Sequence, residues 1–236
     1  NKGDVNITKG MDFTLEFWFN STQTAAATLV SNGTGTGLAS DSLYSWNIAK
    51  DAAGKIHVHH NGNDFVAVDS NYFDGQWHHF ALVLNRVGNI TAYVDGNLQN
   101  SVQALAFGEL GGSAMYLGAR GYYTGTVENF DSHFNGKMDE FRFWDASRKY
   151  EQITRDKQNR MKGDEFALRL YMPFENYALD ATGIPILSAS TAEQIDSTNH
   201  IVLNPNGASI INTTPKIKLP RPIQSVAFTY SVNGDE

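Results

Sequence analysis

Cysteine is absent from the 236 residues of the chain, which excludes disulfide bridges, thiolate zinc sites and cysteine nucleophiles. No apolar run approaches the ~18 residues that a membrane-spanning helix needs, so we expect no membrane insertion. Positive charge is also scarce, because 18 Lys and Arg stand against 25 Asp and Glu and give a net charge of −7. This balance argues against binding to nucleic acid, whose phosphate backbone attracts basic surfaces.

The composition that remains is that of a folded β protein. Apolar residues make up 41% and charged residues 18%, with 21 glycines. A single all-β domain commonly runs to roughly 200–250 residues. A chain of this length can bury a stable core without disulfides or metal ions. Because the chain starts at Asn1 rather than Met, we expect an excised piece of a longer protein that has neighbouring domains.

Alternating apolar and polar residues between turn dipeptides predict many short strands. Asn-Gly and Asp-Gly pairs recur and are typical of tight hairpin turns. In Phe13–Phe19 one strand face carries Phe13, Leu15, Phe17 and Phe19. One helix is expected over residues 147–161. The predicted strands are residues 13–19, 27–31, 44–49, 55–59, 65–68, 77–86, 90–94, 115–118, 137–144 and 167–174. Short strands at this spacing predict an all-β sandwich of two antiparallel sheets.

Four motifs carry a resemblance to a known family: Phe13–Phe19, Trp77–Val83, Ala92–Asn97 and Phe134–Trp144. Their order and spacing resemble the laminin-G-like, concanavalin-A-like jelly rolls of lectins, pentraxins and bacterial surface proteins, over about residues 4–175. The resemblance implies a jelly-roll β-sandwich with one short surface helix and a location outside the cell or on its surface. It implies sugar binding, protein binding or a spacer role, because a fold does not settle function.

The chain divides by composition into two parts. Residues 1–178 form the expected jelly-roll domain, and residues 179–236 form an extension rich in Ser, Thr and Asn. Within that extension, Pro215–Pro222 has the composition of a stiff linker. Ser225–Val232 alternates like one further strand, which belongs either to this domain or to a following one.

Asp139 is the most informative acidic residue. It shares strand parity with Phe141 and Phe143, so if those rings face the core its carboxylate needs a buried partner. The resemblance implies a structural calcium ion bound by this Asp together with oxygens near the N-terminus, for which Asp4 and the turn at Asn32-Gly33 are candidates. The alternative is that Asp139 accepts backbone N–H bonds or pairs with a neighbouring Arg142 or Lys137.

Aromatic residues in expected loops are the candidates for contact with a glycan. Exposed rings suit stacking on sugar C–H surfaces, and polar groups beside them can bond hydroxyls. The same rings can instead cap the core. The predicted ligand-binding residues are Tyr122, Tyr123, Arg120, Asn129, Asp131 and Trp46, which lie in or next to two Gly-rich segments.

His57 and His59 share one face of a predicted strand, a spacing that could bind a transition metal. The sequence shows no third ligand nearby, so we interpret both as ordinary sheet histidines.

Catalysis is not expected. Glucanases of similar shape place paired carboxylates on one strand as Glu-x-Asp-x-x-Glu, and retaining hydrolysis needs them about 5 Å apart. None of the Glu residues has an Asp two positions later, and Glu128 with Asp131 comes closest. The sequence therefore predicts a nonenzymatic module that binds polysaccharide or another glycan, with a protein-interaction or spacer module as the alternative.

Overall fold

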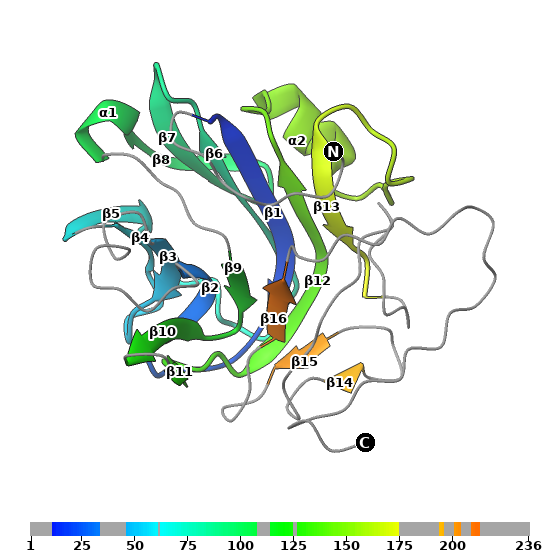
Figure 1. Cartoon of the computed structure of the whole chain (residues 1–236). Coiled ribbons are helices and arrows are strands. Elements are labelled where there is room, and N and C mark those ends of the chain that lie inside the picture. Colours follow the sequence, from blue (N-terminus) through cyan, green and yellow to red (C-terminus); the bar gives the residue numbers. More distant parts are fainter. Residues whose placement is uncertain are drawn as a thin grey trace.

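The computed structural model describes residues 11–33, 46–60, 62–107, 114–124, 127–174, 194–195, 201–203 and 209–212. Two antiparallel sheets stack face to face and enclose one continuous apolar core (Figure 1). The larger sheet has the strand order β14-β15-β12-β1-β6-β7-β8, with β13 also paired to β12, and the smaller sheet has the order β16-β9-β2-β3-β4-β5. The predicted jelly-roll sandwich is confirmed.

The strands of the larger sheet are β1 (Phe13–Asn20), β6 (His78–Leu84), β7 (Asn89–Val94), β8 (Asn97–Gln103), β12 (Gly136–Trp144), β13 (Leu168–Met172), β14 (Gln194–Ile195) and β15 (Ile201–Leu203). Those of the smaller sheet are β2 (Ala27–Gly33), β3 (Trp46–Lys50), β4 (Ile56–His60), β5 (Asn63–Val68), β9 (Ala114–Leu117) and β16 (Ser209–Asn212). A separate hairpin consists of β10 (Arg120–Thr124) and β11 (Val127–Asp131). Two short helices are α1 (Ala104–Phe107) and α2 (Tyr150–Asp156).

Strand β1 lies at the centre of the larger sheet, between β12 and β6. As its alternation predicts, Phe13, Leu15, Phe17 and Phe19 are fully buried in the core between the sheets. The other face of β1 points away from the smaller sheet, yet Glu16 on that face is also fully buried. A second layer must therefore cover the outer face of the larger sheet.

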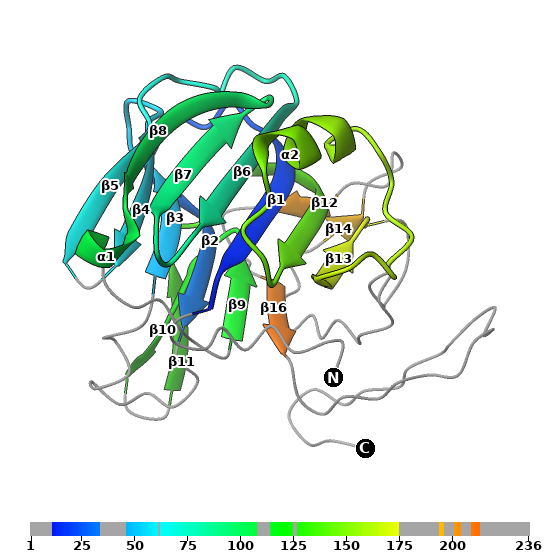
Figure 2. The same cartoon turned by 90° about the horizontal axis from the view of Figure 1, so that it is seen from above.

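That covering layer is α2 and the segment after it (Figure 2). Ile153 is the buried residue of α2 and packs on Ala81 and Val83 of β6. The helix is shorter than the predicted span of 147–161. It begins after Lys149 and ends before Lys157. Neither helix in the part of the chain that the structure describes is long and apolar enough to cross a membrane.

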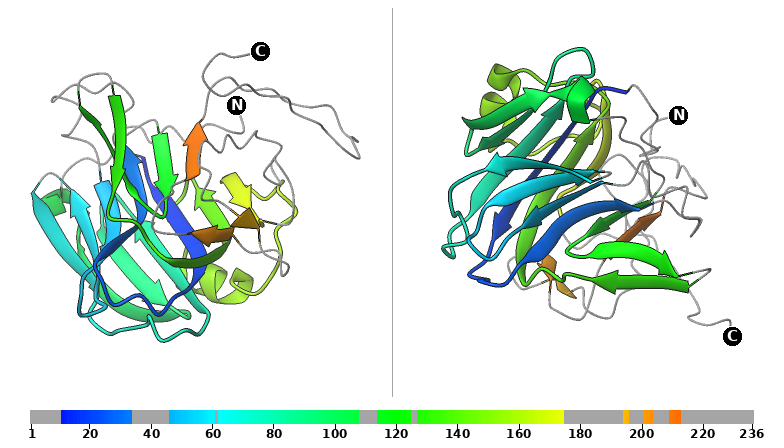
Figure 3. Two further views of the ribbon diagram at one scale, coloured as in Figure 1. Left: turned by 90° about the horizontal axis from the view of Figure 1, so that it is seen from below. Right: turned by 90° about the vertical axis from the view of Figure 1, so that its left-hand side faces the viewer.

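The Gly-rich segment 118–135, expected to be a loop, contains the hairpin β10–β11 (Figure 3). Its strands pair in regular antiparallel register from Arg120↔Asp131 to Thr124↔Val127. The hairpin is joined to the smaller sheet where the N–H of Thr28 donates to the carbonyl of Ser132 at 2.7 Å.

Short strands from the predicted C-terminal extension pair with both sheets. Strand β15 pairs with the start of β12, and β16 pairs with β9 at the edge of the smaller sheet. The predicted strand Ser225–Val232 lies outside the described residues.

Candidate functional site

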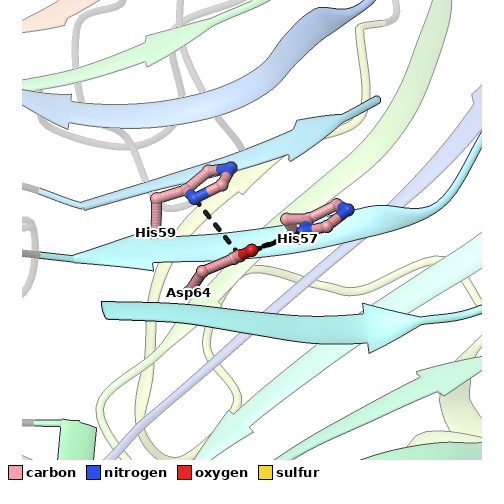
Figure 4. Close-up of side chains that lie close together, drawn as sticks. All are labelled: His57, His59 and Asp64. Atoms are coloured by element: carbon pink, nitrogen blue, oxygen red, sulfur yellow. Dashed lines mark hydrogen bonds and ion pairs between the residues drawn. The ribbon is translucent and has the colours of Figure 1, made fainter. Parts of the chain in front are cut away.

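A groove of about 230 Å³ lies on the outer face of the smaller sheet. Alternation along β4 explains its polar floor: Ile56 and Val58 are buried in the core, whereas His57 and His59 point outward. Asp64 of the neighbouring strand β5 is the cross-strand partner of His59. The three polar side chains therefore gather on one face of two adjacent strands (Figure 4).

His57 lies between two carboxylates. Its Nδ1 is 2.9 Å from Oδ1 of Asp64, and its Nε2 is 3.3 Å from Oδ2 of Asp51. Nδ1 of His59 is 3.3 Å from the same Asp64 oxygen. The two imidazole rings stack almost parallel, with centroids 5.4 Å apart and an interplanar angle of 5°. Nitrogen and oxygen donors thus converge on one point of the groove.

The turn after β3 holds Asp51 in place. Its Oδ1 accepts the backbone N–H groups of Ala53 and Lys55, each at 2.9 Å. Burial alone would raise the pKa of Asp51, but these amide bonds and the neighbouring His57 outweigh it and lower the pKa. Burial lowers the pKa of His59, which favours its neutral ring. The groove thus contains both a carboxyl group and an imidazole whose pKa values are lowered.

The hairpin brings four of the sequence-predicted site residues together. Arg120 is opposite Asp131 in the register, and Tyr122 is opposite Asn129. Nε of Arg120 donates to Oδ1 of Asp131 at 2.8 Å, and this bond lowers the pKa of Asp131. The guanidinium carbon lies 5.7 Å from the ring centroid of Tyr122, which is 42% exposed. We call Arg120, Tyr122, Asn129 and Asp131 the hairpin face.

The opposite side of the hairpin is seated on the smaller sheet. The Phe130 ring packs edge-on against Tyr116 with centroids 5.5 Å apart, and Tyr116 is 1% exposed. Gly121 lies over the same ring, so close that an added Cβ would be 2.6 Å from it. The N–H of Gly121 also donates to Oγ of Ser31 at 3.2 Å. A glycine is needed here because the backbone approaches a buried ring.

We expect Gly121→Ala to destabilise the protein by about 1–3 kcal/mol, the usual cost of overpacking a buried contact. The extra methyl group must push either the hairpin or the Tyr116 ring from its place. Urea unfolding measures the loss. Gly62→Ala is the matched control for adding a methyl group, since nothing lies within 4 Å of that position, although its φ of +78° carries its own strain. A Gly121→Ala protein as stable as the wild type would contradict this seating.

Comparison with known proteins gives the family. The profile of the concanavalin A-like lectin/glucanases superfamily, in its laminin G form, matches residues 2–154. The chain belongs to this superfamily. A search of curated protein sequences finds no significant match.

Solved structures share the superfamily fold. One is a Bacteroides ovatus protein for which carbohydrate binding has been proposed; it matches with a TM-score of 0.55 and 21% identity, over 89% of this chain and 56% of the other. The chain thus spans little more than half the length of that protein. Another is the native heptameric SAP-like pentraxin of Limulus polyphemus, with a TM-score of 0.53, 12% identity, and coverage of 89% and 86%. At these identities the likeness shows the fold alone.

One sequence-predicted residue, Trp46, lies away from the site. Trp46 was expected to stack on a ligand, but it is 2% exposed and its ring stacks on Phe13 in the core at 5.8 Å. It points inward because it shares strand parity with the buried Ile48. The backbone of Tyr123 lies in β10, but its side chain is outside the described residues, as is the whole of Asp4.

Asp139 does not enter the core, because a β-bulge interrupts the alternation of β12. Glu140 has a φ of +52°, and the register with β1 shifts between Glu16 and Trp18. Met138 and Phe141 are both fully buried although they are three positions apart. The extra residue of the bulge turns Asp139 toward the outer face of the larger sheet. The parity argument for a buried Asp139 was therefore wrong.

Asp139 lines a second hollow, of about 420 Å³, between the larger sheet and the segment after α2. Glu140 in the same hollow is engaged by Arg142 at 2.6 Å and by the hydroxyl of Tyr171 at 2.7 Å. Arg142 also donates to two backbone carbonyls of the covering segment. The hollow thus lies at the interface between the larger sheet and the covering layer. Its polar groups bond the two layers to each other.

A calcium ion at Asp139 stays a prediction. The hollow also contains Arg142, Lys157 and Arg160, and positive charges beside a carboxylate oppose a bound cation. Asn32, proposed near the same ion, is 1% exposed in β2. The surroundings of Asp139 therefore fit a calcium site poorly.

Sequence reasoning missed Asp64 and Asp51 as partners of the histidine pair. The signal for Asp64 was present in the sequence, because the dipeptide Asn61-Gly62 is typical of two-residue hairpin turns. Counting outward from that turn pairs His60 with Asn63 and His59 with Asp64, as observed. Asp51 gave no comparable signal, since it reaches His57 through the shape of the preceding turn.

Proposed function

We propose that this chain is a non-catalytic carbohydrate-binding module, and that the groove together with the hairpin face is its glycan site. The observation that carries the proposal is the exposed Tyr122 ring, which lies beside the Arg120 guanidinium on a hairpin whose next residue, Ser132, lines the groove. A glycan site needs an aromatic surface and a few fixed hydrogen-bonding groups. The groove supplies imidazole and carboxylate groups, and the hairpin face supplies the ring, a guanidinium and an amide.

The state of the carboxylates supports a non-catalytic role. A glycosidase needs a general acid whose pKa is raised, so that it is protonated before the bond breaks. The pKa values of Asp51 and Asp131 are instead lowered, by amide hydrogen bonds and by Arg120 respectively. Both carboxylates accept hydrogen bonds in the folded protein and are poor proton donors.

The proposal extends to the setting of the module. Carbohydrate binding has been proposed for the Bacteroides ovatus protein, and the match covers only 56% of it. That partial coverage favours a role for this module within a larger protein. Polysaccharides are met outside the cell, so we place this module on a secreted or cell-surface protein, next to other domains of the same chain.

We expect Tyr122→Ala to weaken glycan binding at least about tenfold, or about 1.4 kcal/mol, because the stacking surface is removed. A glycan array with plant and host polysaccharides identifies the ligand, and calorimetry measures the affinities. Tyr150→Ala is the matched control, since Tyr150 on α2 is 47% exposed but lies over the other sheet. It should leave the affinity unchanged.

Two results would contradict the proposal. If no glycan binds and the chain binds an extracellular protein, the module serves protein interaction. If β-glucans release reducing sugar in the presence of the chain, it is a hydrolase.

A further inference from the structure

We propose that His57, His59 and Asp64 form a binding site for a divalent first-row transition metal, with Zn²⁺ as the simplest case. The site lies on the groove floor, but it goes beyond glycan binding and does not depend on it. The sequence supplied two ligands, and the pairing of β4 with β5 supplies the third.

The donor atoms have the spacing of a metal site. One ligand atom from each of the three residues lies within 4.8 Å of the others. The Asp64 oxygen is 2.9 Å from Nδ1 of His57 and 3.3 Å from Nδ1 of His59. Two ligands of a tetrahedral metal at about 2.0–2.1 Å are separated by about 3.3–3.4 Å. Small side-chain movements therefore suffice to place an ion among the three atoms.

Asp51 is placed to orient His57 as a metal ligand, because it faces the ring nitrogen on the side away from Asp64. With a metal on Nδ1, the remaining N–H on Nε2 faces Oδ2 of Asp51 at 3.3 Å. Metal-binding histidines commonly donate their second N–H to a carboxylate, which orients the ring. Asp51 is itself fixed by the amides of Ala53 and Lys55.

The donor set and its exposure define the class of ion. Two imidazoles and one carboxylate favour Zn²⁺, Cu²⁺, Ni²⁺ or Co²⁺, whereas Ca²⁺ and Mg²⁺ prefer oxygen ligands alone. The side chains of His59 and Asp64 are 43% and 49% exposed, so an ion can reach them from solvent. Three protein ligands leave a fourth position for water or another ligand.

The test uses the untagged chain, stripped of metals with a chelator and then dialysed. Titration with Co²⁺ should produce the visible absorption of a tetrahedral nitrogen and oxygen site, and Zn²⁺ should displace it. Calorimetry with Zn²⁺ should give one site per chain. His59→Gln and Asp64→Asn should each weaken binding at least about tenfold, since even an orienting partner is worth 10–100-fold. Asp51→Asn should weaken it less.

Asp69→Asn is the matched control, because Asp69 is a 75% exposed aspartate directly after β5 that pairs with Lys55 and not with the three proposed ligands. It should bind Zn²⁺ as the wild type does. Circular dichroism confirms that every variant is folded. Absence of saturable Co²⁺ and Zn²⁺ binding would overturn the proposal, and so would equal affinities for the wild type, His59→Gln and Asp64→Asn. Glycan affinity measured in chelator tests the glycan proposal separately.

Discussion

Replacing Arg148 with alanine should lower the free energy of unfolding by about 3–5 kcal/mol, because it leaves the carboxylate of Glu16 buried without its charged partner. Glu16 is fully buried, and its Oε1 accepts a hydrogen bond from Nη1 of Arg148 at 2.7 Å. The guanidinium also bonds Asp156 of α2 and lies 3.9 Å from the ring centroid of Trp144. Arg148 thus links the larger sheet to the helix that covers it.

Urea unfolding at neutral pH measures this loss. The double variant Glu16→Leu/Arg148→Met is the control, since an apolar pair of similar volume removes the uncompensated charge and should recover part of the stability. A loss below about 1 kcal/mol for Arg148→Ala, the range of exposed ion pairs, would contradict the argument.

The loss should also depend on pH. Burial alone would raise the pKa of Glu16, but hydrogen bonding to His79 and the charge of Arg148 outweigh it and lower the pKa below the ordinary 4.5. The stabilisation by ionised Glu16 is therefore present above that ordinary value and is lost as pH falls through the lowered pKa of the folded state. In acid, the stability difference between the wild type and Arg148→Ala should shrink. A difference that stays constant below pH 4.5 would assign the loss to packing on Trp144 instead.

Phe17→Ala should cost about 3–5 kcal/mol, the usual range for removing a buried phenylalanine. Phe17 is fully buried at the centre of β1, with ring centroids 5.3 Å from Phe80 and 6.2 Å from Phe141. The cavity would lie between three strands that are fixed by their ladders, so the site can relax only in part.

Denaturant unfolding of two further variants separates cavity formation from the loss of an aromatic ring as such. Phe17→Leu should cost less, because it refills part of the volume. Phe166→Ala should change stability by no more than about 0.5 kcal/mol, since Phe166 is 95% exposed. Similar losses for Phe17→Ala and Phe166→Ala would show that core packing does not decide the effect.

Alternation and turn dipeptides predicted most of the sandwich. The alternation in Phe13–Phe19 predicts that every second side chain faces the core, and β1 has that pattern in the structure. The sequence did not predict strands whose pattern is weaker. Five of the seven residues of β8 are polar, and β10 and β11 lie in a segment whose glycines suggested a loop. Gly121 is there because the hairpin passes over Tyr116, a contact between distant segments that no local pattern reveals.

The site was predictable in part. The residues Arg120, Tyr122, Asn129 and Asp131 were selected for their chemistry, and the hairpin register places them on one face. Trp46 was selected for the same reason, but its parity with Ile48 already indicated burial.

By itself, the order of residues determined the strand pattern, the core face of β1 and the chemistry available for a glycan site, because these follow from side-chain type and a period of two. The tertiary structure decided which of these side chains lie close together. The bulge at Glu140 turned Asp139 out of the core, and the pairing of β4 with β5 set Asp64 beside His57 and His59. Both depend on backbone register between strands, and register places side chains from different segments within bonding distance.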